Sequence, residues 1–110
     1  MAPTADDERI ARDLTDRLVA AFGNCRVVWF GSRSQGKAQP DSDWDLLVVA
    51  DAAGSLGERL FRARKATRDV RVAKDILVLT PKEYAEYALR PSSVVAAAER
   101  DGRVMHEVAA

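Results

Sequence analysis

Apolar residues recur at steps of three and four along the first part of the chain, from Asp6 to Phe22. This spacing places them on one side of an α-helix, with polar residues on the other side. The Gly23-Asn24 pair follows at once and is typical of a helix C-terminus. The stripe is formed by Ile10, Leu14, Leu18, Ala21 and Phe22.

Short runs rich in β-branched residues follow the first helix and predict buried strands. Cys25 to Phe30 has the sequence CRVVWF, and Leu46 to Ala50 has the sequence LLVVA. A third run, DILVL, lies between Val70 and Leu79. Runs of this length and composition, bounded by glycine or polar residues, are typical of strands in a sheet core. We expect the second strand to be entered from Asp43.

A capping pattern marks the start of a second long helix, between the second and third strands. Ser55 is followed three residues later by Glu58. In a capping box these two side chains satisfy backbone N–H groups at the helix N-terminus. The helix is expected to run to about Arg68.

The same pattern recurs after the third strand. Thr80 and Glu83 form a second capping pair, and Pro81 suits the first helical turn. Pro91 ends this short helix. Ser92 or Ser93 then caps a last helix that stops near Asp101-Gly102, and the following RVMHEV segment predicts a short edge strand. The alternation of helices and strands predicts an α/β domain around a small sheet.

Composition narrows the class of protein. A chain of 110 residues is long enough for one core, so we expect a single domain over residues 1–110. The 17 basic and 17 acidic residues balance, which predicts neither sequence-specific nucleic-acid binding nor attraction to a membrane. No apolar run approaches the roughly 20 residues that cross a bilayer. A polar, acidic N-terminus and a single cysteine, Cys25, favour a soluble cytoplasmic protein.

The GSRSQG segment directly after the first strand is a candidate phosphate site. Gly31 permits close approach of a ligand to the backbone, and Ser32 offers a hydroxyl and an amide. Amides at the start of a helix favour phosphate oxygens. Arg33 and Lys37 could add positive charge. Taken alone, small residues after a strand more often form an ordinary turn.

Two carboxylates precede the second strand. Asp43 and Asp45 flank Trp44, and the apolar LLVV run follows. If the strand has begun by Asp43, alternation puts both carboxylates on one face, with Cα atoms about 7 Å apart. Such a pair can share one hard cation or bridge two. An isolated pair of this kind also occurs where acidic residues only solvate a turn.

A third carboxylate, Asp75, begins the third strand in the sequence AKDILVL. A charged side chain buried without a partner in an apolar strand is costly. Asp75 therefore lies in solvent at the strand edge or faces a cation. Beside Asp43 and Asp45 it would complete a three-carboxylate cluster.

Two other motifs, the P-loop and the EF-hand, overlap this region, but the segment lacks residues that each of them requires. Gly31 to Ala38 has the spacing of a P-loop but lacks the Ser/Thr that binds Mg²⁺, and Pro40 arrives before a long helix could form. The aspartates at 41, 43 and 45 imitate an EF-hand, whose glycine and last glutamate are replaced by Leu46 and Ala52.

The combined pattern resembles the minimal nucleotidyltransferases (MNT) of the DNA polymerase β superfamily. The pattern consists of Gly31-Ser32, ten intervening residues, Asp43-Trp44-Asp45 and a later acidic strand residue. The element order and the closing DGRVMHEV segment also match, so the resemblance covers nearly the whole chain. Trp44 departs from the aliphatic residue that is commoner between the aspartates. The resemblance implies a small mixed sheet flanked by helices, the polymerase β-like nucleotidyltransferase fold.

The resemblance also implies roles for residues. Gly31, Ser32 and Arg33 would contact the phosphates of an NTP, with ATP as the expected substrate. Asp43 and Asp45 would bind two Mg²⁺ ions, and Asp75 would join the ion that activates the acceptor hydroxyl.

The resemblance further points to toxin–antitoxin modules in which such a protein accompanies a helical HEPN ribonuclease. The antitoxin there binds the toxin or transfers AMP to its tyrosine. Transfer to a small molecule such as an aminoglycoside, and a non-catalytic binding role, are the alternatives. The intact set of aspartates argues against the last of these.

A second protein surface is expected to complete the site, because little of the chain remains to bind an acceptor. We expect a homo- or hetero-oligomer whose interface lies beside Ser32, Asp43 and Asp75. A basic run from Arg59 to Lys74 is explained either as a solvated helix face or as a contact for a partner.

Overall fold

The computed structural model describes residues 2–109 and begins with the expected amphipathic helix. Helix α1 spans Ala5–Phe22. It starts where the Thr4 hydroxyl accepts a hydrogen bond from the Asp7 amide at 3.0 Å. It ends at Gly23, whose φ of +73° is a conformation that suits glycine at a helix C-terminus.

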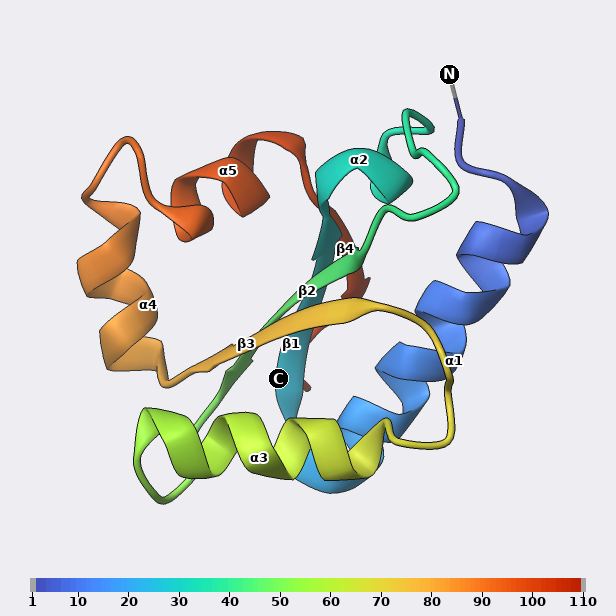
Figure 1. Ribbon diagram of the computed structural model, residues 1–110. Coiled ribbons are helices and arrows are strands. Elements are labelled where there is room, and N and C mark those ends of the chain that lie inside the picture. The colour runs from blue at the N-terminus through green and yellow to red at the C-terminus, as the bar shows by residue number, and fades with distance from the viewer. Residues whose placement is uncertain (1, 110) are drawn as a thin grey trace.

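The sheet has four strands in the order β3-β2-β1-β4. These strands are β1 (Cys25–Phe30), β2 (Trp44–Ala50), β3 (Lys74–Leu79) and β4 (Arg103–His106). Strand β1 is antiparallel to both of its neighbours, whereas β2 and β3 are parallel. The predicted mixed sheet is therefore confirmed, with the last strand at an edge (Figure 1).

The remaining helices begin at the predicted caps. Helix α3 (Leu56–Ala66) and helix α4 (Pro81–Ala88) each open with a complete capping box. Helix α5 (Val94–Asp101) is capped by Ser93. The short helix α2 (Gly31–Ser34) follows β1 without a linker. Helix α3 ends two residues before the expected Arg68, because Thr67 forms its C-cap.

The helices cover the sheet on two faces (Figure 1). Helices α1 and α3 pack on what we call the back face, and the core there includes Leu14, Leu18, Trp29 and Ala63. Helices α4 and α5 pack on the opposite front face, where Val28, Leu47, Leu79, Val95 and Ala98 form a second cluster. Among the described residues, no helix is long and apolar enough to cross a membrane.

The basic run of α3 differs from the expected solvated face at its first residue. The Arg59 side chain is buried, and its Nη2 lies 2.5 Å from Glu83 Oε1. Its other nitrogens donate to the carbonyls of Gly54 and Val78 at 2.6 and 3.3 Å. Burial is possible because each charge-bearing group has a partner. Arg59 thus joins α3 to α4 and β3.

The position of α3 bears on the prediction that its basic run contacts a partner. This helix packs on the back face, whereas alternation from Leu77 places Asp75 on the front face. Helix α3 therefore lies on the face opposite to Asp75, and its role as a contact for a partner stays a prediction.

Candidate active site

The ends of three neighbouring strands, β1, β2 and β3, lie side by side at one end of the sheet. Phe30, the last residue of β1, pairs with Asp45, and Asp45 pairs with Asp75 at the start of β3. Because β1 runs antiparallel to β2, its C-terminal end lies beside the N-terminal ends of β2 and β3. Helix α2, which begins at Gly31, therefore opens beside the two carboxylates.

Gly31 and Asp45 are in close contact. Gly31 has a φ of +81°, and a Cβ atom built on it would lie 2.1 Å from Asp45 Oδ2. Any side chain at position 31 would therefore overlap the carboxylate. The glycine thus allows Asp45 to sit directly against the turn that the sequence identifies as the candidate phosphate site.

The environment of Asp45 opposes its negative charge. Burial, followed by the nearby charges of Asp75 and Asp43, raises the pKa of Asp45 to about 6. Strand β2 begins at Trp44, one residue later than the alternation argument assumed, so Asp43 lies just before it. Asp43 and Asp75 are exposed. The structure thus places the three predicted acidic residues at the same end of the sheet, where the charges of Asp75 and Asp43 raise the pKa of Asp45.

The donor set fits a divalent cation in its chemistry. Mg²⁺ prefers carboxylate oxygens, and clustered carboxylates repel one another until a cation neutralises them. Within residues 2–109, no three His, Cys, Asp or Glu side chains are arranged to hold one metal ion. Because Asp43 and Asp75 are exposed, their carboxylates can change rotamer at low cost. Asp45, by contrast, is partly buried against Gly31.

Arg33, expected at the phosphates, is engaged within the protein. Its side chain is buried, with Nη1 3.0 Å from Asp7 Oδ1. Nε donates to the Ser42 carbonyl at 2.8 Å, and Nη2 donates to the Pro40 carbonyl at 3.0 Å. The guanidinium carbon lies 3.7 Å from the centre of the Trp44 ring. These contacts join α1, α2 and the segment that leads into β2.

Sequence reasoning missed Asp7. An acidic residue in the first turn of a helix is ordinarily explained by the helix dipole, and no local pattern connects it to Arg33. Trp44, noted only as a departure from the family pattern, has a role here: its Nε1 donates to the Asp7 carbonyl at 3.3 Å. The position between the two aspartates is thus anchored to α1.

Replacing Arg33 with methionine is expected to lower the free energy of unfolding by about 3 kcal/mol, because Asp7 would keep a buried charge without its partner. Urea denaturation measures this loss. The matched control is Arg9→Met, which removes an exposed ion pair with Asp6 and should change stability by less than about 0.5 kcal/mol. Equal effects of the two substitutions would contradict the assigned role of Arg33.

The chain matches the family model of the nucleotidyltransferase domain over residues 9–101. None of the curated proteins matches it. Solved structures share the fold. One is a toxin–antitoxin complex with AMP-PNP, with a TM-score of 0.62 and 21% identity over 88% of this chain and 73% of the other.

Two further structures are similar at low identity. A protein from Sulfolobus solfataricus described as a nucleotidyltransferase has a TM-score of 0.59 and 21% identity, over 87% of this chain and 76% of its own. The complex of a tri-AMPylated Shewanella oneidensis HEPN toxin with an MNT antitoxin contains a chain with a TM-score of 0.60 and 17% identity. That match covers 93% of this chain and 73% of the other. The match to the family model covers β1, β2, β3 and the candidate site, and by it the chain belongs to the nucleotidyltransferase domain family.

Proposed function

We propose that the chain is a Mg²⁺-dependent nucleotidyltransferase that moves AMP from ATP to a tyrosine hydroxyl of a HEPN-type partner and so acts as an antitoxin. The observation that carries the catalytic part is the position of Asp45. Its carboxylate lies against Gly31 and beside Asp75, with a pKa raised to about 6. A carboxylate whose charged form is disfavoured by burial and by neighbouring carboxylates is typical of a functional site.

In this proposal the turn at Gly31 and Ser32 holds the β- and γ-phosphates through backbone amides and the serine hydroxyl. Asp43 and Asp45 would hold two Mg²⁺ ions, and Asp75 would join the ion nearer the acceptor. The ions would supply neutralisation of the charge that develops on the phosphates and the leaving group. Arg33 then has a positioning role, since its contacts fix the segment that carries Asp43.

The reaction is a substitution at the α-phosphorus. A bond forms between the acceptor oxygen and the α-phosphorus, while the bond from this phosphorus to the oxygen bridging the β-phosphate breaks. Pyrophosphate leaves, and the hydroxyl proton passes to the exposed carboxylate of Asp75 and from there to water. Most of the catalytic effect comes from positioning and charge neutralisation, so no histidine or cysteine is required.

The partner is suggested by the similar structures. One of them is a complex of an MNT antitoxin with a HEPN toxin that carries AMP groups, and another contains AMP-PNP. The shared fold makes the same reaction a coherent proposal for this chain. Incubation with α-labelled ATP, Mg²⁺ and the product of the neighbouring gene tests it. Label should appear on a tyrosine of that product. Label on kanamycin instead would favour the small-molecule alternative, and partner binding without label would favour a non-catalytic antitoxin.

Nucleotide binding is expected to depend on a divalent cation. Phosphate oxygens would otherwise approach the negatively charged edge formed by Asp43, Asp45 and Asp75 without compensation. Calorimetry with a non-hydrolysable ATP analogue should detect binding in Mg²⁺ and at least tenfold weaker binding in EDTA. Equal affinity under both conditions would contradict the assignment of these aspartates as metal ligands.

A further inference from the structure

A small cavity opens on the front face directly beside Asp75. Its volume is about 220 Å³, and Phe30, Leu77 and Val94 line it together with this carboxylate. Apart from Asp75 its walls are apolar. A cavity with one carboxylate among apolar side chains suits a group that is apolar along its length and polar at its tip.

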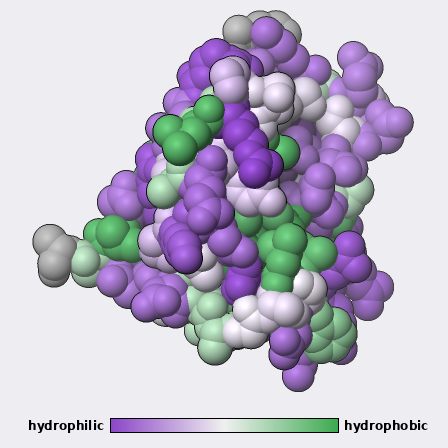
Figure 2. Space-filling view, turned by 90° about the vertical axis from the view of Figure 1, so that its left-hand side faces the viewer, coloured by the Kyte–Doolittle hydropathy of each residue, from purple (hydrophilic) through white to green (hydrophobic). Residues whose placement is uncertain are grey.

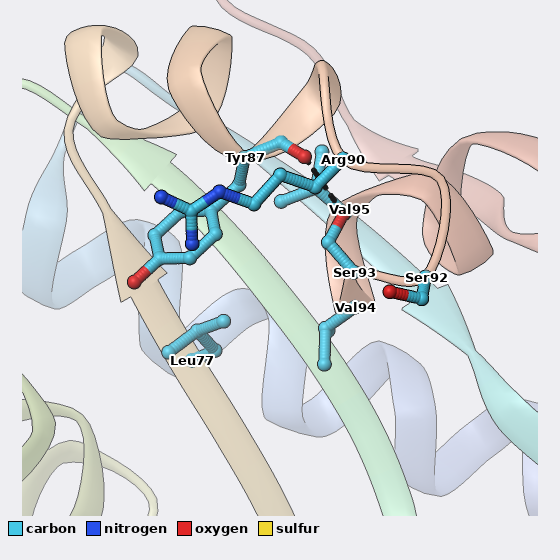
Figure 3. A pocket seen from close by; sticks show the side chains of 7 residues that line it. All are labelled: Leu77, Tyr87, Arg90, Ser92, Ser93, Val94 and Val95. Carbon is cyan, nitrogen blue, oxygen red and sulfur yellow. Dashed lines mark hydrogen bonds between the residues drawn. The ribbon is translucent and has the colours of Figure 1, made fainter.

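A larger cavity of about 450 Å³ adjoins the first one, and Leu77 and Val94 line both. It lies at the elbow between α4 and α5. Figure 3 shows Tyr87 and Arg90 projecting over Leu77, with Val94 pointing into the same space from α5. The Arg90 guanidinium carbon is 5.1 Å from the centre of the Tyr87 ring. The two cavities form what we call the β3 groove.

The surface around the elbow agrees with this description. Figure 2 faces the α4–α5 side of the molecule and shows small groups of hydrophobic residues between hydrophilic ones. Val94 and Tyr87 are 47% and 37% exposed, although both are large and apolar or aromatic. Exposed groups of this kind that line a cavity are characteristic of binding surfaces.

The direction of the reaction determines what the groove can receive. If Gly31 and Ser32 hold the β- and γ-phosphates, the leaving pyrophosphate lies over the end of β1. Displacement at phosphorus is in line, so the acceptor must approach from the opposite side. In the strand order β3-β2-β1-β4, the opposite side of Asp45 is β3. The β3 groove begins there, at Asp75.

Resting on the proposed function, we infer that the β3 groove is the acceptor-binding site and that it receives a tyrosine flanked by acidic residues on a partner protein. The ring packs between Leu77 and Val94, so that its hydroxyl reaches Asp75. Carboxylates next to the tyrosine meet Arg90. The larger cavity takes the residues on either side of the tyrosine.

The charge of the larger cavity favours this occupant over an aminoglycoside. Aminoglycosides are polycations and require carboxylates along their binding site. Of the described residues, those lining the larger cavity include Arg90 and no acidic side chain. Arg90 would repel a polycation and attract an acidic peptide.

Blocking the groove tests the inference. Val94→Trp enlarges a side chain that lines both cavities, whereas Val104→Trp is the matched control on β4, at the far edge of the sheet. Both valines are about half exposed, at 47% and 46%, so either site tolerates a larger side chain. The probe is a blocked pentapeptide with a central tyrosine between glutamates, added to protein saturated with Mg²⁺ and a non-hydrolysable ATP analogue. Binding is followed by NMR of the Leu77 methyl groups and by calorimetry.

We expect the peptide to shift the Leu77 methyl signals of the unsubstituted protein. Val94→Trp should weaken peptide binding at least tenfold and leave the affinity for the ATP analogue within twofold. With ATP in place of the analogue, it should slow AMP transfer to the peptide at least tenfold. Val104→Trp should change none of these. Arg90→Glu should weaken binding of the acidic peptide, while Arg100→Glu on α5 should leave it unchanged.

Several results would overturn the inference. If Val94→Trp weakens binding of the ATP analogue as much as binding of the peptide, the groove holds the nucleoside. If the peptide fails to bind, or if kanamycin shifts the Leu77 signals and the peptide does not, the assigned acceptor is wrong. Failure of the proposed function looks different: the unsubstituted protein would then show no Mg²⁺-dependent binding of the ATP analogue, whatever the peptide does.

Discussion

Asp45→Asn is expected to abolish nucleotidyl transfer and at the same time to stabilise the fold. The substitution keeps the shape of the side chain but removes a charge that would bind the metal ions. We expect transfer to fall at least a thousandfold, or about 4 kcal/mol in activation free energy. Stability rises because the folded protein disfavours the charge of this carboxylate. Its partial burial, followed by the nearby charges of Asp75 and Asp43, raises its pKa to about 6.

The stabilisation should depend on pH in a defined direction. The ordinary pKa of this carboxyl is 3.8, and in the folded protein it is about 6. The folded state therefore binds a proton that the unfolded state has lost, and the stability from this proton disappears as pH rises through about 6. The amide of the Asp45→Asn variant does not titrate. In EDTA the variant should exceed the unsubstituted protein by about 1 kcal/mol at pH 8, after allowance for solvent screening.

Thermal denaturation in EDTA between pH 4 and pH 8 measures this difference, which corresponds to several degrees in Tm. The gap should close toward pH 4, where Asp45 is protonated. Asp51→Asn, an exposed carboxylate directly after the other end of β2, is the control and should alter neither activity nor Tm. An Asp45→Asn protein that is less stable at pH 8, or that retains transfer, would contradict the assigned environment.

Local patterns predicted the elements of this fold well because each depends on residues close in sequence. The pairs Ser55 with Glu58 and Thr80 with Glu83 form the expected capping boxes. Alternation within a strand likewise placed Asp45 on the face opposite to Trp44. The mixed sheet came from the resemblance to a family, since strand order depends on contacts between distant segments.

The buried ion pairs could not be predicted for the same reason. Arg33 pairs with Asp7, and Arg59 pairs with Glu83, across 26 and 24 residues of sequence. A basic residue beside a candidate phosphate site, or within a basic run, gives no sign that its charge is satisfied inside the protein. The pKa of Asp45 also depends on the pairing of β2 with β3, which the sequence alone does not reveal.

Gly31→Ala is expected to slow transfer about a hundredfold with only a small loss of stability. The added Cβ would lie 2.1 Å from Asp45 Oδ2, so one of the two must move. The carboxylate oxygen is at the end of a short side chain and turns away at little cost to the fold. Displacement of a metal-binding group by about 1 Å is enough to cause a loss of this size.

Gly23→Ala separates this displacement from backbone strain. Gly23 has a φ of +73°, close to the +81° of Gly31, but a Cβ there would meet nothing within 4 Å. Both substitutions place alanine at a positive φ, so both should destabilise the fold by about 1 kcal/mol. Only Gly31→Ala should also reduce transfer and weaken binding of the Mg²⁺–nucleotide complex. If the two variants lose activity equally, backbone strain alone explains the effect, and the contact between Gly31 and Asp45 has no part in catalysis.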